Sequence, residues 1–156
     1  MTIEPARTTE KTGGPRVKQF SVFLRNKVGA LLDLVKMLNE HAIQVLAVSV
    51  QDSADAAIVR IIVSDPEHTE RLLTEHENAC SVSSVVVAEL KEGAADLAKL
   101  LTCLLMAEVN LHTGYALLTR PRGSVAVVLH VEDDECASAV LESHSFRLLS
   151  QADISR

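Results

Sequence analysis

Residues 20–35, which read FSVFLRNKVGALLDLV, decide the fold. In the first part of this stretch, the side chains of Phe20, Val22 and Leu24 alternate with the residues between them, and this spacing is typical of a strand. Apolar residues then recur at the spacing i, i+3, i+4 and i+7, which is one face of a helix. They are Leu31, Leu34, Val35 and Leu38. The stretch therefore predicts a strand, a tight turn and a helix.

The turn between this strand and this helix contains Asn26 and Gly29. Asn tolerates a left-handed backbone, and Gly allows a sharp bend or a close approach of another molecule. The first N–H groups of a helix lack partners within the helix and carry a partial positive charge. A strand that enters a helix through Gly29 can therefore hold a carboxylate or another small anion.

The composition limits the class of protein. The chain has 156 residues, of which 47% are hydrophobic, which suits one large or two small domains. A net charge of −6 without a basic cluster, and only 3% aromatic residues, argue against a nucleic-acid partner. No apolar run reaches about 18 residues, so we expect no membrane span. Three scattered cysteines indicate a reducing, cytoplasmic setting and fit neither a zinc site nor a disulfide framework. We expect no metal ion and no cofactor.

The order of elements in the first half predicts an α+β fold. Residues 1–16 are polar and predict a disordered tail. The pattern that follows is strand, helix, strand, strand, helix, strand, which is the ferredoxin-like βαββαβ arrangement with an antiparallel sheet and both helices on one face. The expected elements are strands 17–24, 43–50, 57–63 and 82–90, a helix over 30–40 and a second helix capped by Asp65.

The pattern returns after about 67 residues, so the chain contains an internal repeat. Leu97 to Leu104 repeat the first helix, Asp133 replaces Asp65 as a helix cap, and 146–154 is expected to be the closing strand. No linker rich in Gly or Pro separates the copies. We expect two units that pack as one rigid body, over residues 17–83 and 84–156, with the boundary near Ser84.

Several of these segments resemble the tandem ACT domain proteins, in particular the stand-alone double-ACT, amino-acid-binding regulatory proteins. The similarity begins with 23–31, a strand, an Asn-x-x-Gly-x-Leu turn and a helix. It continues in order through 47–50, 60–66, 109–111, 115–116, 127–133 and 146–150. The resemblance implies a regulatory fold that binds amino acids or similar small ligands at ACT–ACT interfaces.

By position, the resemblance implies ligand contacts at one corner and on the strand of a neighbouring unit. The implied residues are Asn26, Val28, Gly29, Ala30 and Leu31 at the corner, Val48 and Ser49 on the facing strand, and Tyr115 in the second unit. The second corner departs from the family pattern, because Ala95 stands where the family has Gly and two acids, Glu92 and Asp96, flank it. We expect that corner to repel a carboxylate.

Plainer readings of the same residues remain open. Asn26 and Gly29 suit any strand-to-helix turn, and Val48 and Ser49 suit an ordinary strand. Arg60 is expected to lie along the surface and pair with an acid, or to link two chains.

No nucleophile elbow, phosphate loop or paired-cysteine motif supports catalysis. The sequence therefore predicts a non-enzymatic protein that binds a small-molecule ligand, most simply an amino acid, as a homodimer that regulates a partner enzyme. The alternative is a regulatory subunit that docks on a biosynthetic enzyme without binding a ligand. Neither hypothesis involves nucleic acid or a membrane.

Overall fold

The computed structural model describes residues 16–25 and 28–155, so Asn26 and residues 1–15 of the expected tail lie outside the described residues. The first half contains β1 (Val17–Arg25), α2 (Val28–Glu40), β2 (Val45–Asp52), β3 (Ala56–Val63), α3 (Pro66–Glu75) and the long strand β4 (Cys80–Leu90). The second half contains α4 (Ala94–Met106), β5 (Leu111–Ala116), a 3-10 turn (Pro121–Gly123), β6 (Val125–Val131), α5 (Asp134–Ser143), β7 (Leu148–Leu149) and α6 (Gln151–Ile154).

The strand β4 belongs to both halves of the molecule. Its first part pairs antiparallel with β1, from Cys80 to Val85, and its second part pairs with β6, from Val86 to Leu90. Within this second part, at Val87 and Ala88, β4 also pairs with β7. The strands follow the order β2-β3-β1-β4-β6-β5, which is two ferredoxin-like sheets joined through one strand. The expected boundary near Ser84 falls inside β4, close to the point where its partner changes.

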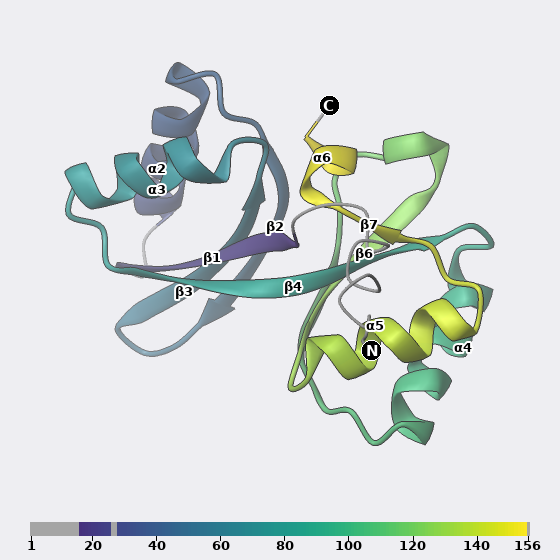
Figure 1. Ribbon diagram of the computed structural model, residues 1–156. Helices are drawn as coiled ribbons and strands as arrows, with labels where there is room; N and C mark the ends of the chain where they lie inside the picture. Colours follow the sequence, from purple (N-terminus) through teal and green to yellow (C-terminus); the bar gives the residue numbers. More distant parts are fainter. Residues whose placement is uncertain (1–15, 26–27, 156) are drawn as a thin grey trace, which may run out of the picture.

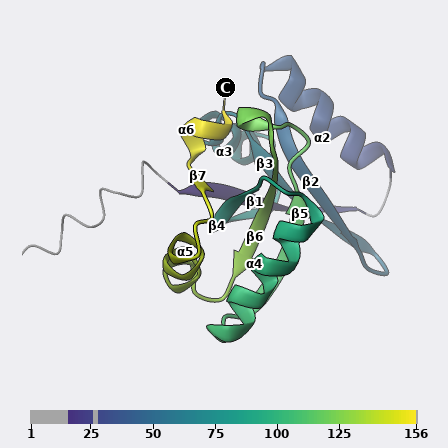
Figure 2. The ribbon, with the colours of Figure 1, turned by 90° about the vertical axis from the view of Figure 1, so that its right-hand side faces the viewer.

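The helices cover one face of each sheet, and the two helical faces point in opposite directions. Figure 1 shows α2 and α3 above the sheet of the first unit and α4 and α5 below that of the second, with β4 running through both. Figure 2 shows the same two layers from the side. Each helix pair covers a separate core. None of the helices in the described part of the chain is long and apolar enough to cross a membrane.

The faces of the two sheets that carry no helices pack against each other. Their shared core contains Val17 and Ile62 from the first unit, Ala126 and Val128 from the second, and other residues from both: Leu46, Ala47, Val85, Val87, Leu117, Leu149 and Ile154. The N–H of Leu118 donates to the carbonyl of Leu46 at 2.7 Å, which ties the two edges together. The first unit's strands are therefore covered on both faces within one chain, and their apolar residues need no second chain to bury them.

The predicted helix ends are confirmed. The Asp65 carboxylate accepts from the N–H of His68 at 3.1 Å, and the Asp133 carboxylate accepts from the N–H of Cys136 at 3.0 Å. Each cap satisfies a first-turn N–H group that has no partner within its helix. The side chains thus fix where α3 and α5 begin, at equivalent places in the two units.

The predicted closing strand over 146–154 is wrong except at two residues. Only Leu148 and Leu149 are in a strand, and a short helix follows. The backbone N–H of Ser150 donates to the Asp153 carboxylate at 2.8 Å, while the Ser150 hydroxyl accepts from the N–H of Asp153 at 3.3 Å. This reciprocal capping box starts α6, and the turn places Ile154 in the core between the units.

Candidate functional site

The corner between β1 and α2 is open at the first residues of the helix. Val28 is 88% exposed, Gly29 is exposed, and no acidic side chain lies in the first turn of α2. Among the described residues, a Cβ atom built on Gly29 would meet nothing within 4 Å, so they leave the backbone here accessible. The N-terminus of α2 therefore carries a partial positive charge that no carboxylate from its own first turn neutralises.

The next residues of α2 connect this corner to two different surroundings. Ala30 lines a groove of 550 Å³ that runs along α2 toward His76 and Asn78. Leu31 instead packs on the core of the first unit, where Val48 also packs. The structure therefore brings Leu31 and Val48 to one core and leaves Val28 and Gly29 at the surface.

The corner before α4 is built differently. Gly93 precedes the helix with a φ of 63°, a left-handed conformation that favours glycine. The Asp96 carboxylate accepts from the N–H of Glu92 at 2.8 Å, so an internal acid already binds a donor of this loop. The expectation that this corner disfavours a ligand carboxylate stays a prediction.

Ser49 and Tyr115 lie on the other face of their sheets, between the units. Ser49 is in register with Arg60 on β3, and Tyr115 packs against the shared core. The Tyr115 hydroxyl donates to the Oε1 atom of Gln19 on β1 at 2.6 Å. Burial raises the pKa of Tyr115 above its ordinary value, and the nearby charge of Arg60 opposes this effect. The residues implied by the resemblance are thus divided between the α2 corner and the junction of the two units.

A groove in the second unit was not foreseen from the sequence. Gly114 pairs with Leu129 at the position where the first unit pairs Val48 with Ile61, so a side chain is missing on the helical side of the sheet. The result is an apolar groove of 510 Å³ between α4 and β5, lined by Gly93, Leu97, Leu101, Leu111, Gly114 and neighbouring apolar residues. Matching the two hairpins residue by residue could have revealed it.

Leucines on the exposed side of α4 extend this groove. Leu97, Leu101 and Leu105 follow one another at helical spacing and are 36%, 43% and 75% exposed. Met106 is 76% exposed. In α2, the positions equivalent to Leu105 and Met106 hold Asn39 and Glu40. The shared fold therefore does not require apolar residues there.

A model of the family described as the ACT domain pair matches residues 16–156. The chain belongs to this family. The match covers both ACT units and confirms the resemblance seen in the sequence. Because ACT domains are regulatory domains, membership supports a regulatory role.

Solved structures share the architecture of this ACT pair. Protein BT0572 from Bacteroides thetaiotaomicron is 28% identical, with 90% of this chain and 96% of that chain covered and a TM-score of 0.82. The regulatory subunit of aspartate kinase from Thermus thermophilus, in a ligand-free form, is 13% identical, with 86% and 93% covered and a TM-score of 0.59. The corresponding subunit from Thermus flavus is 15% identical, with 85% and 93% covered and a TM-score of 0.58. A comparison with curated proteins finds no match.

Proposed function

We propose that this ACT pair is a non-enzymatic, cytoplasmic regulatory protein that binds an amino acid at an ACT–ACT interface. The observation that carries the proposal is the contrast between the two corners. The α2 corner has a bare Gly29 and no acid in its first turn, whereas Asp96 occupies a donor of the α4 corner. The α2 corner would therefore accept the carboxylate of a ligand, whereas the α4 corner already binds the carboxylate of Asp96.

At the α2 corner, the backbone N–H groups of Gly29 and Ala30 would donate to the carboxylate of the ligand. A hydrogen bond to a charged group contributes about 1.5–3 kcal/mol. Asn26 would orient the turn, Val28 and Leu31 would contact the ligand side chain, and Val48 and Ser49 of a neighbouring unit would complete the site. Since the ligand would touch two units, occupancy would favour one arrangement of those units over another.

We propose further that the chain forms a homodimer through its second unit. The exposed stripe of Leu97, Leu101 and Leu105 lies beside β5, which is the last strand of the sheet. An apolar stripe beside an open strand edge is a surface that proteins normally cover. A two-fold interface would bury both features with the same residues from each copy.

The direct test is calorimetric titration of the full chain with a panel of amino acids. We expect one amino acid to bind below millimolar concentration, and Gly29→Val to abolish this binding. The Cβ atom of the new side chain meets no neighbour among the described residues, so the fold should be unchanged by circular dichroism.

Ala95→Val is the matched control, because Ala95 occupies the equivalent position in the second unit. It should leave the affinity unchanged. If Gly29→Val binds as well as the natural chain, the corner is not the site. If no amino acid binds, the sensing function in this form is wrong.

The alternative is a subunit that docks on a biosynthetic enzyme without a ligand of its own. The relatives named above include regulatory subunits of aspartate kinase, and the exposed leucines of α4 would suit a protein partner. Recovery of an enzyme in a pull-down from the native source, with no dependence on added amino acids, would favour this alternative.

A further inference from the structure

Two histidine rings meet at the open end of the hairpin that β5 and β6 form. The rings of His112 on β5 and His130 on β6 lie 5.2 Å apart, centroid to centroid, with an angle of 61° between their planes. Within the described residues, none of their ring nitrogens takes part in a hydrogen bond or an ion pair. Neutral imidazole is the commonest metal ligand among side chains. The pair therefore offers two nitrogen ligands that no protein group occupies.

The pair lies at a β-bulge. Leu111 pairs with Val131 and Thr113 pairs with His130, so His112 is an extra residue on β5. A bulge redirects a side chain, and bulges are frequent next to functional sites. Both histidines belong to strands rather than to a loop, and strands hold binding residues more precisely than loops do.

The first unit has the same bulge with apolar residues. There the extra residue is Leu46 on β2, and Ile62 on β3 holds the position that His130 has on β6. Leu46 and Ile62 are 1% and 0% exposed and belong to the core between the units. In contrast, His112 is exposed and His130 is half-buried. The shared fold therefore accepts an apolar pair at these positions and does not require histidines.

The distance between the two rings fits one tetrahedral ion. Zinc binds an imidazole nitrogen at about 2.0–2.1 Å, which places the ion about 3.2 Å from the centroid of the ring. Two centroids that are 5.2 Å apart then subtend about 109° at the ion, which is the tetrahedral angle. The rings of His41 and His68 are 5.6 Å apart and would subtend a wider angle of about 122°. Rotation about χ2, which is broad for His, can turn the nitrogens of His112 and His130 toward one point.

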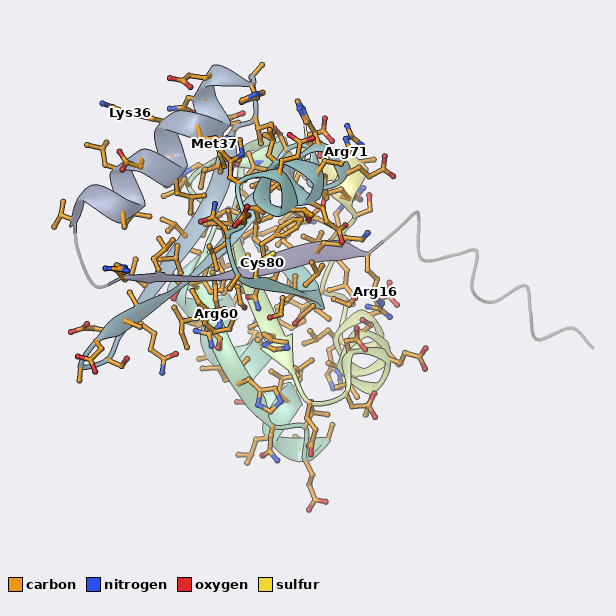
Figure 3. All side chains as sticks on the ribbon, turned by 90° about the vertical axis from the view of Figure 1, so that its left-hand side faces the viewer. Arg16, Lys36, Met37, Arg60, Arg71 and Cys80 are labelled. Atoms are coloured by element: carbon orange, nitrogen blue, oxygen red, sulfur yellow. The ribbon has the colours of Figure 1, made fainter. Side chains whose placement is uncertain are left out.

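The charges around the pair are mixed. Burial and the charges of His112 and Arg60 lower the pKa of His130, while the Asp134 carboxylate on α5 raises it. Figure 3 shows Arg60 on the side of the first sheet that faces the second unit, and its guanidinium donates to the Oε1 atom of Gln51 at 2.9 Å. Arg60 disfavours a further cation and Asp134 favours one. The affinity for a metal ion would therefore come from the two metal–nitrogen bonds.

We propose that His112 and His130 bind a divalent transition-metal ion that prefers imidazole, with zinc as the best fit to the geometry. Within the described residues, no group of three or more His, Cys, Asp or Glu side chains could hold a metal ion, so water would fill the remaining positions. The bound ion would join the edge strand β5 to β6 across the bulge. The sequence predicts no metal ion because no short spacing connects these two histidines, and only the strand pairing places them side by side.

The test is nuclear magnetic resonance of the imidazole rings in the full chain, prepared without a histidine tag, during titration with zinc chloride at neutral pH. We expect saturable one-to-one binding that shifts the ring nitrogens of His112 and His130 and leaves those of the other four histidines unchanged. Magnesium chloride is the control ion. It should shift neither ring, because Mg²⁺ takes oxygen ligands.

His112→Gln should weaken zinc binding by about 10–100-fold, because losing one of two ligands costs at least as much as losing a residue that only orients a ligand. His112 is exposed, so the fold should be retained by circular dichroism. His130→Gln should weaken binding to the same extent.

His41→Gln is the matched control, since it disrupts the other pair of histidine rings, and it should leave the affinity for zinc unchanged. The proposal is overturned if zinc shifts neither the His112 nor the His130 ring, or if it shifts all six histidine rings without saturation. It is also overturned if His41→Gln weakens binding as much as His112→Gln does.

Discussion

At the scale of single residues, the pair Tyr115–Gln19 shows how the two units are fixed to each other. The hydroxyl–amide bond of 2.6 Å is buried at the junction, where an unpaired polar group is costly. Tyr115 occupies the position that Ser49 has in the first unit. Its partner Gln19 lies on β1, in the other unit. The pair therefore sets the register of one sheet on the other.

This environment predicts an unusual titration of Tyr115. The chain has one tyrosine and no tryptophan, so near-ultraviolet absorbance reports the ionisation of Tyr115 alone. We expect its pKa in the folded protein to exceed the ordinary value of about 10, because burial disfavours the charged form.

The sign of the stability change follows from this shift. Above the ordinary pKa the unfolded chain loses the Tyr115 proton while the folded chain keeps it, so stability should fall as the pH rises. Tyr115→Phe should lack this part of the alkaline loss, measured by urea unfolding across the pH range. Ionisation at the ordinary pKa in the folded protein would contradict the burial of this hydroxyl.

At the scale of elements, α2 and α4 are equivalent helices with different outer surfaces. Both bury leucines on the side that faces their sheet: Leu34 and Leu38 in α2, and Leu100 and Leu104 in α4. They differ at the end, where Asn39 and Glu40 correspond to Leu105 and Met106. The repeat thus has one helix suited to solvent and one suited to a further partner.

The difference predicts that α4 carries the dimer contact. Leu105→Glu would place a charge in the centre of a dry interface, where an unpaired charge is strongly disfavoured. We expect a dimer for the natural chain and a monomer for this variant by light scattering. Leu105 is 75% exposed in the single chain, so the fold should be retained.

Leu32→Glu is the control for the same change on α2, where Leu32 is 50% exposed. It should leave the dimer intact. If Leu32→Glu dissociates the dimer and Leu105→Glu does not, the interface lies on the first unit. If the natural chain is a monomer, the dimer proposal is wrong.

At the scale of the whole molecule, the two units share both a strand and a core. Half of β4 completes the first sheet and the other half lies inside the second. The core between the sheets includes the buried side chains of Val17, Ile62, Val87 and Val128. Separating the units would expose this core and divide β4 from one set of its partners.

We therefore predict a single cooperative unfolding transition for both units. In the calorimeter, the van't Hoff and calorimetric enthalpies should agree. A fragment ending at residue 83 should fail to fold alone, because it lacks Val85 and Val87 from the core. Two resolved transitions, or a folded fragment, would show that the units are independent.

The sequence by itself determined the local elements and their order. Alternating residues gave β1, helical spacing gave α2 and α4, and Asp65 and Asp133 marked the starts of α3 and α5, because each signal depends on neighbours within a few residues. The same patterns, repeated, identified a tandem ACT arrangement. The capping box at Ser150 and Asp153 is also a local signal, but the repeat favours a longer strand at the same place.

Only the tertiary structure decided how the two units meet. The hydrogen bonds from Tyr115 to Gln19 and from the N–H of Leu118 to the carbonyl of Leu46 join residues far apart in the chain, and no local spacing encodes them. The helix-free faces of the two sheets cover each other in the structure, so each unit buries the apolar residues of the other. Burial depends on which surfaces are available to pack, and that depends on the whole fold rather than on any segment of the sequence.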